Sequence, residues 1–370
     1  MRATAPVAYD ERSDTWHVFR YEDVQRVLSK HAVFSSEFGR QPGQELHPAI
    51  QASLVSTDPP RHRQLRTIVS RAFTPRAVDA LAPRIAQIVD ELLDKVVEAG
   101  EMDLVWDFAH PLPVIVIAEL LGIPVEERDQ FKRWSNAVIM GPTGASASPS
   151  GPAEAHRELA QHFSRLIEER RRQPKDDLLS HLLAARIEGQ HLEWNALVGF
   201  CVFLLLAGTE TTTNLIGNAM LCLDESPETL AELRRDPSLL PDAIEEVLRY
   251  RSPVQSMFRT VTRDTTIGDK ELRAGQRVFA WVGSANRDEL AFEDAERFDI
   301  RRVPNRHLAF GQGIHFCLGA PLARLETRIA LTALLERLPD LRRVPGAPLV
   351  RIASAMVYGV TSLPVTFSIP

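Results

Sequence analysis

Cysteine is scarce in this chain, and the number and spacing of its cysteines argue against both a disulfide framework and a structural zinc site. The 370 residues contain three cysteines, Cys201, Cys222 and Cys317. An odd number without a paired spacing argues against a disulfide framework, and the lack of a Cys-x-x-Cys or cysteine–histidine cluster argues against structural zinc. Such sparse cysteine usage is typical of a reducing compartment, so we expect a cytoplasmic protein.

A basic excess and long hydrophobic runs are also missing. The chain has 43 Lys and Arg against 49 Asp and Glu, a formal net charge of −6, which argues against binding to nucleic acid. Residues 1–14 are polar and predict neither a signal peptide nor a membrane anchor. The longest apolar run, residues 196–207, is too short to span a membrane and predicts a buried helix.

Internal repeats are absent, and only residues 141–152 have a low-complexity composition, rich in Gly, Ser and Pro. This composition predicts a loop. A linker between two domains is one interpretation, but helical patterns on both sides, over residues 125–140 and 153–172, favour a mobile loop inside one domain. We therefore expect a single domain over residues 1–370, with 44% hydrophobic residues to fill its core.

Helical periodicity is the dominant pattern that the sequence does contain. Apolar residues recur at helical spacing over residues 75–99, 177–186, 192–223 and 241–250. Strand patterns are short and few, and they alternate as edge or hairpin strands do, over residues 16–19, 277–281 and 365–369. The sequence therefore predicts a mainly α-helical fold with a small β component.

A glycine-punctuated loop that ends at a cysteine is the most informative segment. Residues 310–319 read Phe-Gly-Gln-Gly-Ile-His-Phe-Cys-Leu-Gly. Gly311, Gly313 and Gly319 allow unusual backbone conformations and a close approach to a flat ligand. A helical pattern follows at once, so the sulfur of Cys317 would lie at a helix N-terminus, which stabilises a thiolate. A buried, inert thiol is the commoner state of cysteine, but these neighbours favour an iron ligand.

This cysteine loop resembles the haem-binding signature of the cytochromes P450. Three further segments resemble the same family in the same order along the chain, at residues 58–66, 207–212 and 246–249. A Glu-x-x-Arg pair such as Glu246 and Arg249 alone says little, because exposed i,i+3 pairs contribute only weakly. The order carries the resemblance, which implies the P450 fold: a helix-rich domain with a small β subdomain and haem between the long central helix and the helix after the cysteine.

The resemblance implies haem b as the cofactor, with Cys317 as the iron ligand. No dinucleotide-binding glycine motif is present, so no bound flavin or NAD(P) is expected. The haem propionates need cationic or hydrogen-bonding partners, and the matching positions are His62, Arg66, Arg259 and His315. His62 and Arg66 are i,i+4 on a helix expected after the prolines at 59 and 60, while Arg61 and Arg63 are interpreted as solvated. The other cofactor-binding positions that the family implies are Ala207, Phe310 and Gly319.

Polar residues interrupt the apolar pattern around residue 208. Gly208 is unfavourable in a helix and leaves room for a bulky partner such as a flat cofactor. Burying Glu210 is costly unless it has a function, although a helix that surfaces here would also explain these residues. By resemblance, Glu210 and Thr211 are the acid–alcohol pair that supplies protons for oxygen activation. The resemblance also implies that Glu246 and Arg249 form a structural ion pair behind the haem, joined by Arg297.

The family resemblance implies a haem-thiolate monooxygenase that inserts one atom of O2 into a C–H bond, with electrons from a separate ferredoxin or flavodoxin. A peroxide-driven peroxygenase of the same fold and a non-enzymatic haem sensor are the alternatives, and the pair Glu210 and Thr211 argues against both. We expect a monomer. Four arginines could form a local docking patch for the electron donor, although each also fits an ordinary surface position: Arg63, Arg71, Arg306 and Arg324.

The substrate is expected to be a hydrophobic small molecule such as a fatty acid, terpenoid, steroid or macrolide. In the resembling family the loop at residues 141–152 forms a lid over the substrate channel. The implied pocket positions are mostly small or apolar in this chain, and none offers a charged anchor: Ala207, Val254, Met257 and Val357.

Overall fold

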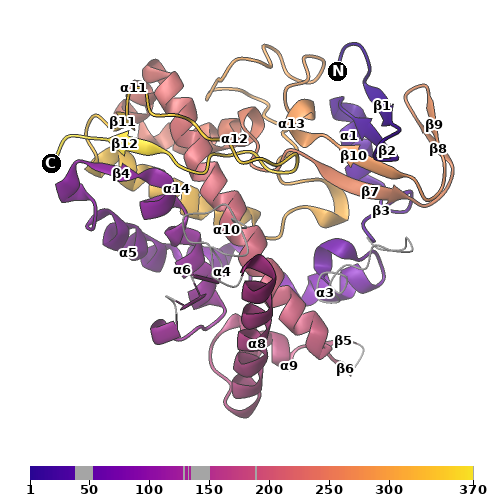
Figure 1. Ribbon diagram of the computed structural model, residues 1–370, viewed down its shortest axis with the longest axis horizontal. Coiled ribbons are helices and arrows are strands. Elements are labelled where there is room, and N and C mark those ends of the chain that lie inside the picture. The colour runs from indigo at the N-terminus through magenta and orange to yellow at the C-terminus, as the bar shows by residue number, and fades with distance from the viewer. Residues whose placement is uncertain (38–52, 128–129, 132, 135–150, 188–189, 370) are drawn as a thin grey trace. The chain divides into compact units, whose positions relative to one another are not determined.

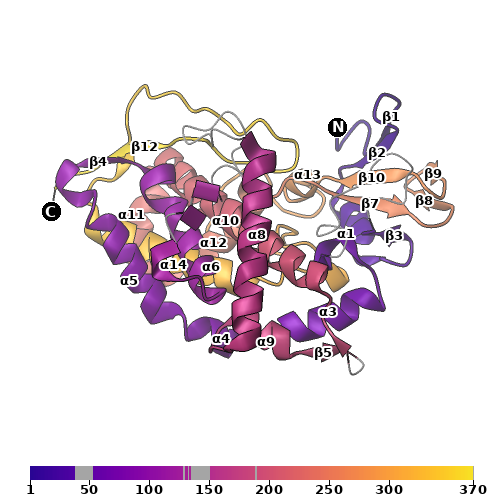
Figure 2. The same ribbon diagram turned by 60° about the horizontal axis from the view of Figure 1, so that its bottom comes forward.

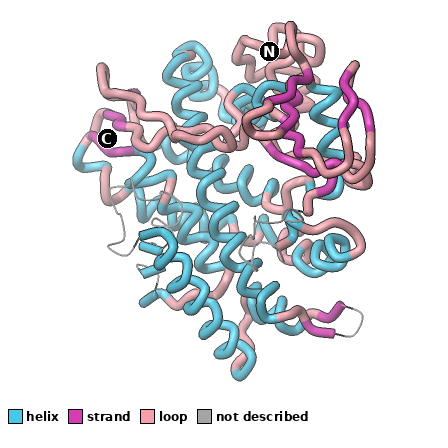
Figure 3. The backbone as a smooth tube through the Cα atoms, turned by 45° about the vertical axis from the view of Figure 1, so that its right-hand side comes forward, coloured by secondary structure: helices cyan, strands magenta, loops and turns pink. Residues whose placement is uncertain are grey.

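The computed structural model describes residues 1–369 except 38–52, 128–129, 132, 135–150 and 188–189 (Figure 1). About 52% of the chain is helical, and helices predominate throughout Figure 3. The chain divides into two compact units. The first unit consists of Met1–Glu37, Ala82–Ala109 and Thr211–Pro370, and the second consists of Phe38–Leu81 and His110–Glu210. The expectation of a single domain over residues 1–370 stays a prediction.

The first unit combines helices with most of the strands. Its helices are α1 (Tyr21–Ser29), α5 (Ala82–Leu93), α11 (Pro227–Arg235), α12 (Leu240–Tyr250), α13 (Val282–Ala285) and α14 (Ala320–Arg337), with short turns at Val97–Ala99, Leu104–Ala109, Pro237–Leu239 and Gly313–His315. Its strands are β1 (Val7–Asp10), β2 (Thr15–Val18), β3 (Phe34–Ser35), β4 (Glu101–Asp103), β7 (Met257–Val261), β8 (Thr265–Ile267), β9 (Lys270–Leu272), β10 (Arg277–Ala280), β11 (Arg342–Arg343) and β12 (Pro364–Thr366).

Five of these strands form the main sheet, in the order β1-β2-β10-β7-β3. β1 and β2 make an antiparallel hairpin, β10 runs parallel to β2, and β7 is antiparallel to β10. Val18 and Val278 of this sheet and Val24, Val27 and Leu28 of α1 belong to one buried core cluster. Elsewhere in the unit α14 packs along α5 and against α12, as Figure 2 shows for α5 and α14.

The strands predicted at residues 16–19 and 277–281 are found, as β2 and β10, whereas β12 (Pro364–Thr366) overlaps only the first two residues of the predicted strand 365–369. β2 is a hairpin strand, as predicted. β10 is not an edge strand, because it lies between β2 and β7, and β12 is the middle strand of the three-stranded sheet β11-β12-β4. Alternation along a strand reports which side chains point to the core, but it contains no information on how many neighbours the strand has.

The second unit is built almost entirely from helices. They are α3 (Arg61–Val69), α4 (Pro75–Asp79), α6 (Pro111–Leu120), α8 (Gly151–Arg172) and α9 (Leu178–Ala184), with short turns at Leu54–Ser56 and Val125–Glu127 and a small hairpin of β5 (Arg186–Ile187) and β6 (Gln190–His191). The buried guanidinium of Arg170 joins three parts of this unit, since it binds Asp177 at 2.5 Å and the carbonyl of Gly122 at 2.5 Å. Gly122 has φ +74°, and a Cβ there would lie 2.2 Å from Asp177 Oδ2, so only glycine fits.

The long helix α10 (Trp194–Glu225) passes from the second unit into the first. It confirms the predicted buried helix, because Ala196, Leu197, Cys201 and Leu205 are all buried. By length and composition α10 is the one helix in the described residues that could cross a membrane. However, 56% of its most apolar window is buried inside the protein, and the core helix of a soluble protein has the same character.

Two helix predictions and one loop prediction need correction or lie outside the described residues. The segment 75–99 is divided into α4, α5 and a short turn. Pro83 lies in the first turn of α5 and lacks an N–H donor, so a helix continuing from α4 would lose the hydrogen bond from residue 83 to the carbonyl of Asp79. α8 begins at Gly151, so the last two residues of the predicted loop 141–152 are helical. The rest of that loop and most of the pattern over 125–140 lie outside the described residues.

Candidate functional site

The cysteine loop has the backbone conformation that its glycines predict at two positions. Gly311 has φ +74° and Gly313 has φ +73°, both in the left-handed region. Gly313 also approaches α1 closely, because a Cβ there would lie 3.0 Å from the Cα of Ser29. Gly319 differs: its φ is −83°, which any residue can adopt, and a Cβ there would meet none of the described atoms within 4 Å. Backbone freedom therefore does not explain glycine at 319.

Cys317 lies between a closed loop and the helix that follows it. Its N–H donates to the carbonyl of Phe310 at 2.8 Å, which closes the loop, and α14 begins three residues later at Ala320. The side chain is partly exposed, whereas Cys201 and Cys222 are buried, and burial raises the pKa of each of those two thiols to about 12. Of the three cysteines, only Cys317 is therefore accessible as a possible ligand.

The predicted propionate contacts come from both units. In the second unit α3 begins at Arg61 directly after Pro60, as predicted, with His62 buried and Arg66 half-buried one turn later. In the first unit Arg259 lies on β7, is buried, and donates to the carbonyl of Phe258 at 2.8 Å, while His315 lies in the cysteine loop. Arg63 is exposed, as expected, but Arg61 is half-buried.

Glu210 and Thr211 are adjacent in the middle of α10, and both are half-buried. Burial raises the pKa of the Glu210 carboxyl above its usual range, because a charged carboxylate is poorly solvated there. A carboxyl group with this property keeps its proton to higher pH and can still release it, which suits a proton donor.

The space beside Gly208 is occupied by a side chain of the second unit. A Cβ at residue 208 would lie 3.0 Å from Cδ1 of Ile117 on α6. The close approach that the sequence predicts at this glycine is therefore real, but the partner seen here is α6. Thr213, further along α10, donates to the carbonyl of Ala109 at 3.3 Å.

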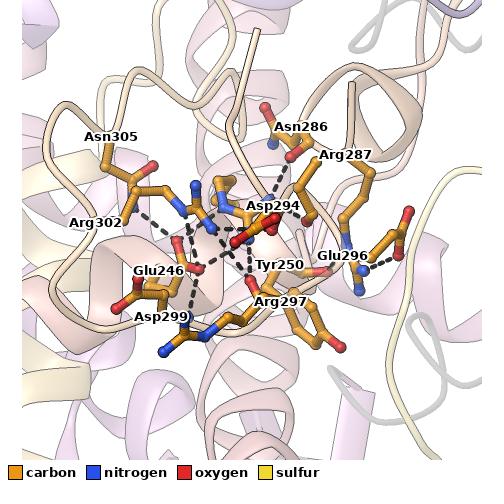
Figure 4. A network of polar contacts seen from close by, with 12 residues as sticks. Glu246, Tyr250, Asn286, Arg287, Asp294, Glu296, Arg297, Asp299, Arg302 and Asn305 are labelled. Carbon is orange, nitrogen blue, oxygen red and sulfur yellow. Dashed lines mark hydrogen bonds and ion pairs between the residues drawn. The ribbon is translucent and has the colours of Figure 1, made fainter. Parts of the chain in front are cut away.

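Glu246 and Arg249 form the predicted ion pair on α12, with 2.8 Å between the guanidinium and each carboxylate oxygen and 0% exposure of both side chains. The prediction that Arg297 joins this ion pair is wrong for its side chain. Arg297 contributes only its carbonyl, which accepts from Arg249 at 2.8 Å, and the second cation is Arg302, 3.3 Å from Glu246. Figure 4 shows this arrangement around Glu246.

Further donors complete the environment of this pair. The N–H of Asp299 and the amide of Asn305 donate to Glu246, and the carbonyls of Asn286 and Ala295 accept from Arg249. Breaking one side of such a buried pair leaves an uncompensated charge, so the network ties residues 286–305 firmly to α12. Nothing in the sequence distinguishes a carbonyl contact at 297 from a side-chain contact.

Three of the four predicted pocket residues belong to the first unit. Val254 and Val357 form a β-bridge, which the hydrogen bond from the N–H of Tyr358 to the carbonyl of Pro253 extends. Met257 reaches Gly311, where a Cβ would lie 3.6 Å from its methyl carbon. The fourth, Ala207, is on the half of α10 that belongs to the second unit, and it is half-buried.

Comparison with known proteins agrees with this geometry. The family model for cytochrome P450 matches residues 151–339. Cytochrome P450 109 of Bacillus spizizenii is 42% identical over 371 residues, covering 99% of this chain and 89% of that protein. Substrate-free CYP109E1 from Bacillus megaterium is 46% identical, with a TM-score of 0.95 over 100% of this chain and 97% of that one. The CYP109E1 complex with corticosterone is 45% identical, with a TM-score of 0.90 over 99% and 96%.

A helical fold, a cysteine displayed ahead of a helix and relatives of this similarity define a haem-dependent class of enzyme. The chain belongs to the cytochrome P450 family and is similar to bacterial members over its whole length. The predicted P450 fold is confirmed. The protein is accordingly an oxidoreductase, a P450 monooxygenase, and haem is the cofactor that its family implies.

Proposed function

We propose that this enzyme hydroxylates a hydrophobic small molecule, with Cys317 as the ligand of a haem b iron and with electrons from a separate ferredoxin or flavodoxin. The observation that carries the proposal is the contrast among the cysteines. Cys201 and Cys222 are buried with raised pKa values, and Cys317 alone is partly exposed ahead of a helix N-terminus. The donor chemistry of this chain therefore fits thiolate ligation.

The bound haem supplies oxygen activation, which an anionic sulfur ligand favours. The residues proposed to hold its propionates are Arg66 and Arg259, whose guanidinium groups suit carboxylates, with His62 and His315 as hydrogen-bond donors. Ala207, Phe310 and Gly319 are proposed to contact the ring. These assignments rest on the residue types and on their positions in α3, β7, α10 and the cysteine loop.

Glu210 and Thr211 are proposed as the proton-delivering pair. The Glu210 carboxyl is half-buried and its pKa is raised, so it keeps its proton to higher pH than an exposed carboxyl, and it is proposed to pass that proton on through the hydroxyl of Thr211. A peroxygenase would need no such pair, so its presence favours the monooxygenase. The Glu246–Arg249 network is proposed to keep residues 286–305 in place and to take no part in proton transfer.

The substrate is proposed to enter an apolar pocket that includes Val254, Met257 and Val357. A similar enzyme binds corticosterone, and the small apolar character of these positions supports a steroid or a molecule of like polarity. The protein is further proposed to act as a cytoplasmic monomer.

Spectroscopy tests the ligand assignment directly. The reduced carbon-monoxide complex of wild-type protein is expected to show the Soret band of thiolate ligation, which is well separated from that of imidazole or neutral ligands. Cys317→Ser and Cys317→His should lose that band, whereas Cys201→Ser and Cys222→Ser should keep it. An unchanged spectrum for Cys317→Ser would contradict the proposal. Titration with corticosterone, against lauric acid as a comparison, tests the substrate class through the spin-state change.

A further inference from the structure

A second cluster of polar and charged side chains, which is partly buried, lies beside the cysteine loop and is distinct from the Glu246–Arg249 network. Arg324 of α14 makes a two-pronged contact with Glu245 of α12, at 2.6 and 2.8 Å. His307, three residues before the loop, contacts the same carboxylate at 3.0 Å. All three residues belong to the first unit. We call Glu245, Arg324 and His307 the Glu245 cluster.

The charges of the Glu245 cluster are well defined. Burial by itself raises the pKa of Glu245, but the hydrogen bonds from Arg324 and His307 outweigh it and lower that pKa to about 2. His307 Nδ1 accepts from the N–H of Ala309 at 3.2 Å, so Nε2 must carry the proton that binds Glu245. The carboxylate is therefore charged at neutral pH, and both of its partners are donors.

The Glu245 cluster holds the first residue of the cysteine loop. The guanidinium carbon of Arg324 lies 4.5 Å above the ring of Phe310, and the ring of His307 lies 6.0 Å from that ring. Phe310 in turn accepts, through its carbonyl, the N–H of Cys317 at 2.8 Å. The chain of contacts thus runs from Glu245 through Arg324 and Phe310 to the backbone of the cysteine.

Adjacent residues on a helix point in different directions, which separates the two networks. Glu246 faces residues 286–305, whereas Glu245 faces α14 and the cysteine loop. Arg324 also donates twice to one carboxylate in a fixed geometry, which a lysine cannot reproduce.

We propose that the Glu245 cluster positions the cysteine loop, and that it keeps the Cys317 sulfur in place as an anionic ligand by clamping Phe310. This inference rests on the proposed haem-thiolate function. It also gives Arg324 a role other than the electron-donor docking considered from the sequence. Glu245, Arg324 and His307 act through Phe310 and are positioning residues, since none of them is placed in contact with the reacting groups.

The test uses Glu245→Gln, with Arg328→Gln as a control for the loss of an exposed charge on α14, four residues after Arg324. Loss of a charge-assisted hydrogen bond from a partly buried pair should raise the ratio of thiol-ligated to thiolate-ligated reduced carbon-monoxide complex roughly tenfold. The haem reduction potential should shift in the same variant. Arg328→Gln should match wild type in both measurements.

A conservative variant keeps the test decisive if Glu245→Gln does not fold. Arg324→Lys preserves the charge but loses the two-pronged contact and the stacking on Phe310. Its ratio of thiol-ligated to thiolate-ligated complex should therefore lie between those of wild type and Glu245→Gln. Far-ultraviolet circular dichroism, recorded on the same samples, separates altered ligation in folded protein from unfolding. Wild-type spectra for both Glu245→Gln and Arg324→Lys would overturn the inference, whereas a wild-type protein without any thiolate band would instead overturn the proposed function.

Discussion

Three glutamates, Glu210, Glu245 and Glu326, differ in charge because their surroundings differ. Glu245 receives hydrogen bonds from two donors, and its pKa falls to about 2. Glu210 is half-buried, and its pKa rises through loss of solvation. Glu326 on α14 is fully buried, and its pKa rises to about 8. The same residue type is thus expected as a permanent anion, as a proton donor and as a neutral acid.

Glu326 is expected to make stability depend on pH. Its Oε2 has no hydrogen-bond partner among the described residues. Since its pKa is about 8 in the folded protein and 4.5 ordinarily, the unfolded chain loses the proton first, and rising pH between these values favours unfolding. The loss of folding stability is absent below the ordinary pKa of Glu326 and complete above its pKa in the folded protein. At about 1.4 kcal/mol per pKa unit, the complete loss is on the order of 5 kcal/mol.

Glu326→Gln should therefore be more stable than wild type at pH 9 and nearly equal to it at pH 5. Urea unfolding of the haem-loaded protein at both pH values measures the difference. The exposed Glu336→Gln on the same helix is the control and should follow wild type. A stability gap between Glu326→Gln and wild type that is the same at both pH values would show that burial does not keep Glu326 neutral.

Thr211→Ala is expected to keep haem and substrate binding while diverting electrons to peroxide, because proton delivery from Glu210 loses its relay hydroxyl. The measurement is product formed per NADH consumed in a reconstituted ferredoxin system. Thr213→Ala provides a comparison, since its hydroxyl binds the carbonyl of Ala109 instead, and it should remain coupled. Full coupling in Thr211→Ala would reduce Thr211 to an ordinary helix residue.

At the scale of elements, buried and partly buried ion pairs join segments that are separate in sequence. The Glu246–Arg249 network ties α12 to residues 286–305, and the Glu245 cluster ties α12 to α14. In the second unit Arg170 joins α8 to Asp177, which also caps α9 by accepting from the N–H of Ser180 at 2.8 Å. Each of these pairs fixes the position of one element relative to another within its unit.

Arg170→Met should destabilise the protein by about 3–5 kcal/mol, because it leaves the Asp177 carboxylate buried without its partner. Burial raises the pKa of Asp177, but the Arg170 contact and the bonds from Ser180 outweigh it, and the net pKa is lowered. The contribution of this carboxylate is therefore present above its ordinary pKa of 3.8 and is lost as the pH falls below it.

Urea unfolding at pH 7 and pH 3.5 tests this prediction, and the difference between Arg170→Met and wild type should shrink at the lower pH. Arg172→Met, at an exposed position on the same helix, controls for loss of a positive charge. If Arg170→Met and wild type were equally stable at pH 7, the Arg170–Asp177 pair would stabilise the protein no more than a buried methionine does.

At the scale of the whole molecule, a net charge of −6 coexists with local cations that could receive an acidic electron donor. Of the four arginines considered, Arg324 is engaged with Glu245, whereas Arg63, Arg71 and Arg306 are exposed. Arg306→Glu should lower the rate of reduction by ferredoxin several-fold at low salt, and the difference from wild type should diminish as salt screens the charges.

Stopped-flow reduction over a range of ionic strength measures this effect. Arg12→Glu, an equally exposed arginine in the turn between β1 and β2, makes the same change in net charge and should leave the rate near that of wild type. If Arg12→Glu and Arg306→Glu slow reduction equally, net charge governs the encounter and no local patch is needed.

Much of the fold and of the candidate site could be predicted from the sequence because both depend on local patterns. The helices near residues 192–223 and 241–250 follow from apolar periodicity, which a buried helix must have. The cysteine loop follows from glycines at positions that require positive φ and from the helical pattern behind the cysteine. Together with the order of the motifs, these patterns were enough to indicate the P450 fold, which is confirmed.

Tertiary structure alone decided the features that depend on partners distant in sequence. The interior position of β10, the approach of Ile117 to Gly208, the entry of Arg302 in place of the Arg297 side chain, and the contact of Glu245 with Arg324 all join segments that no local pattern relates. Sequence periodicity reports which face of an element is buried. Which side chain meets that face depends on how the whole chain packs, and so does the protonation state of a buried carboxyl group.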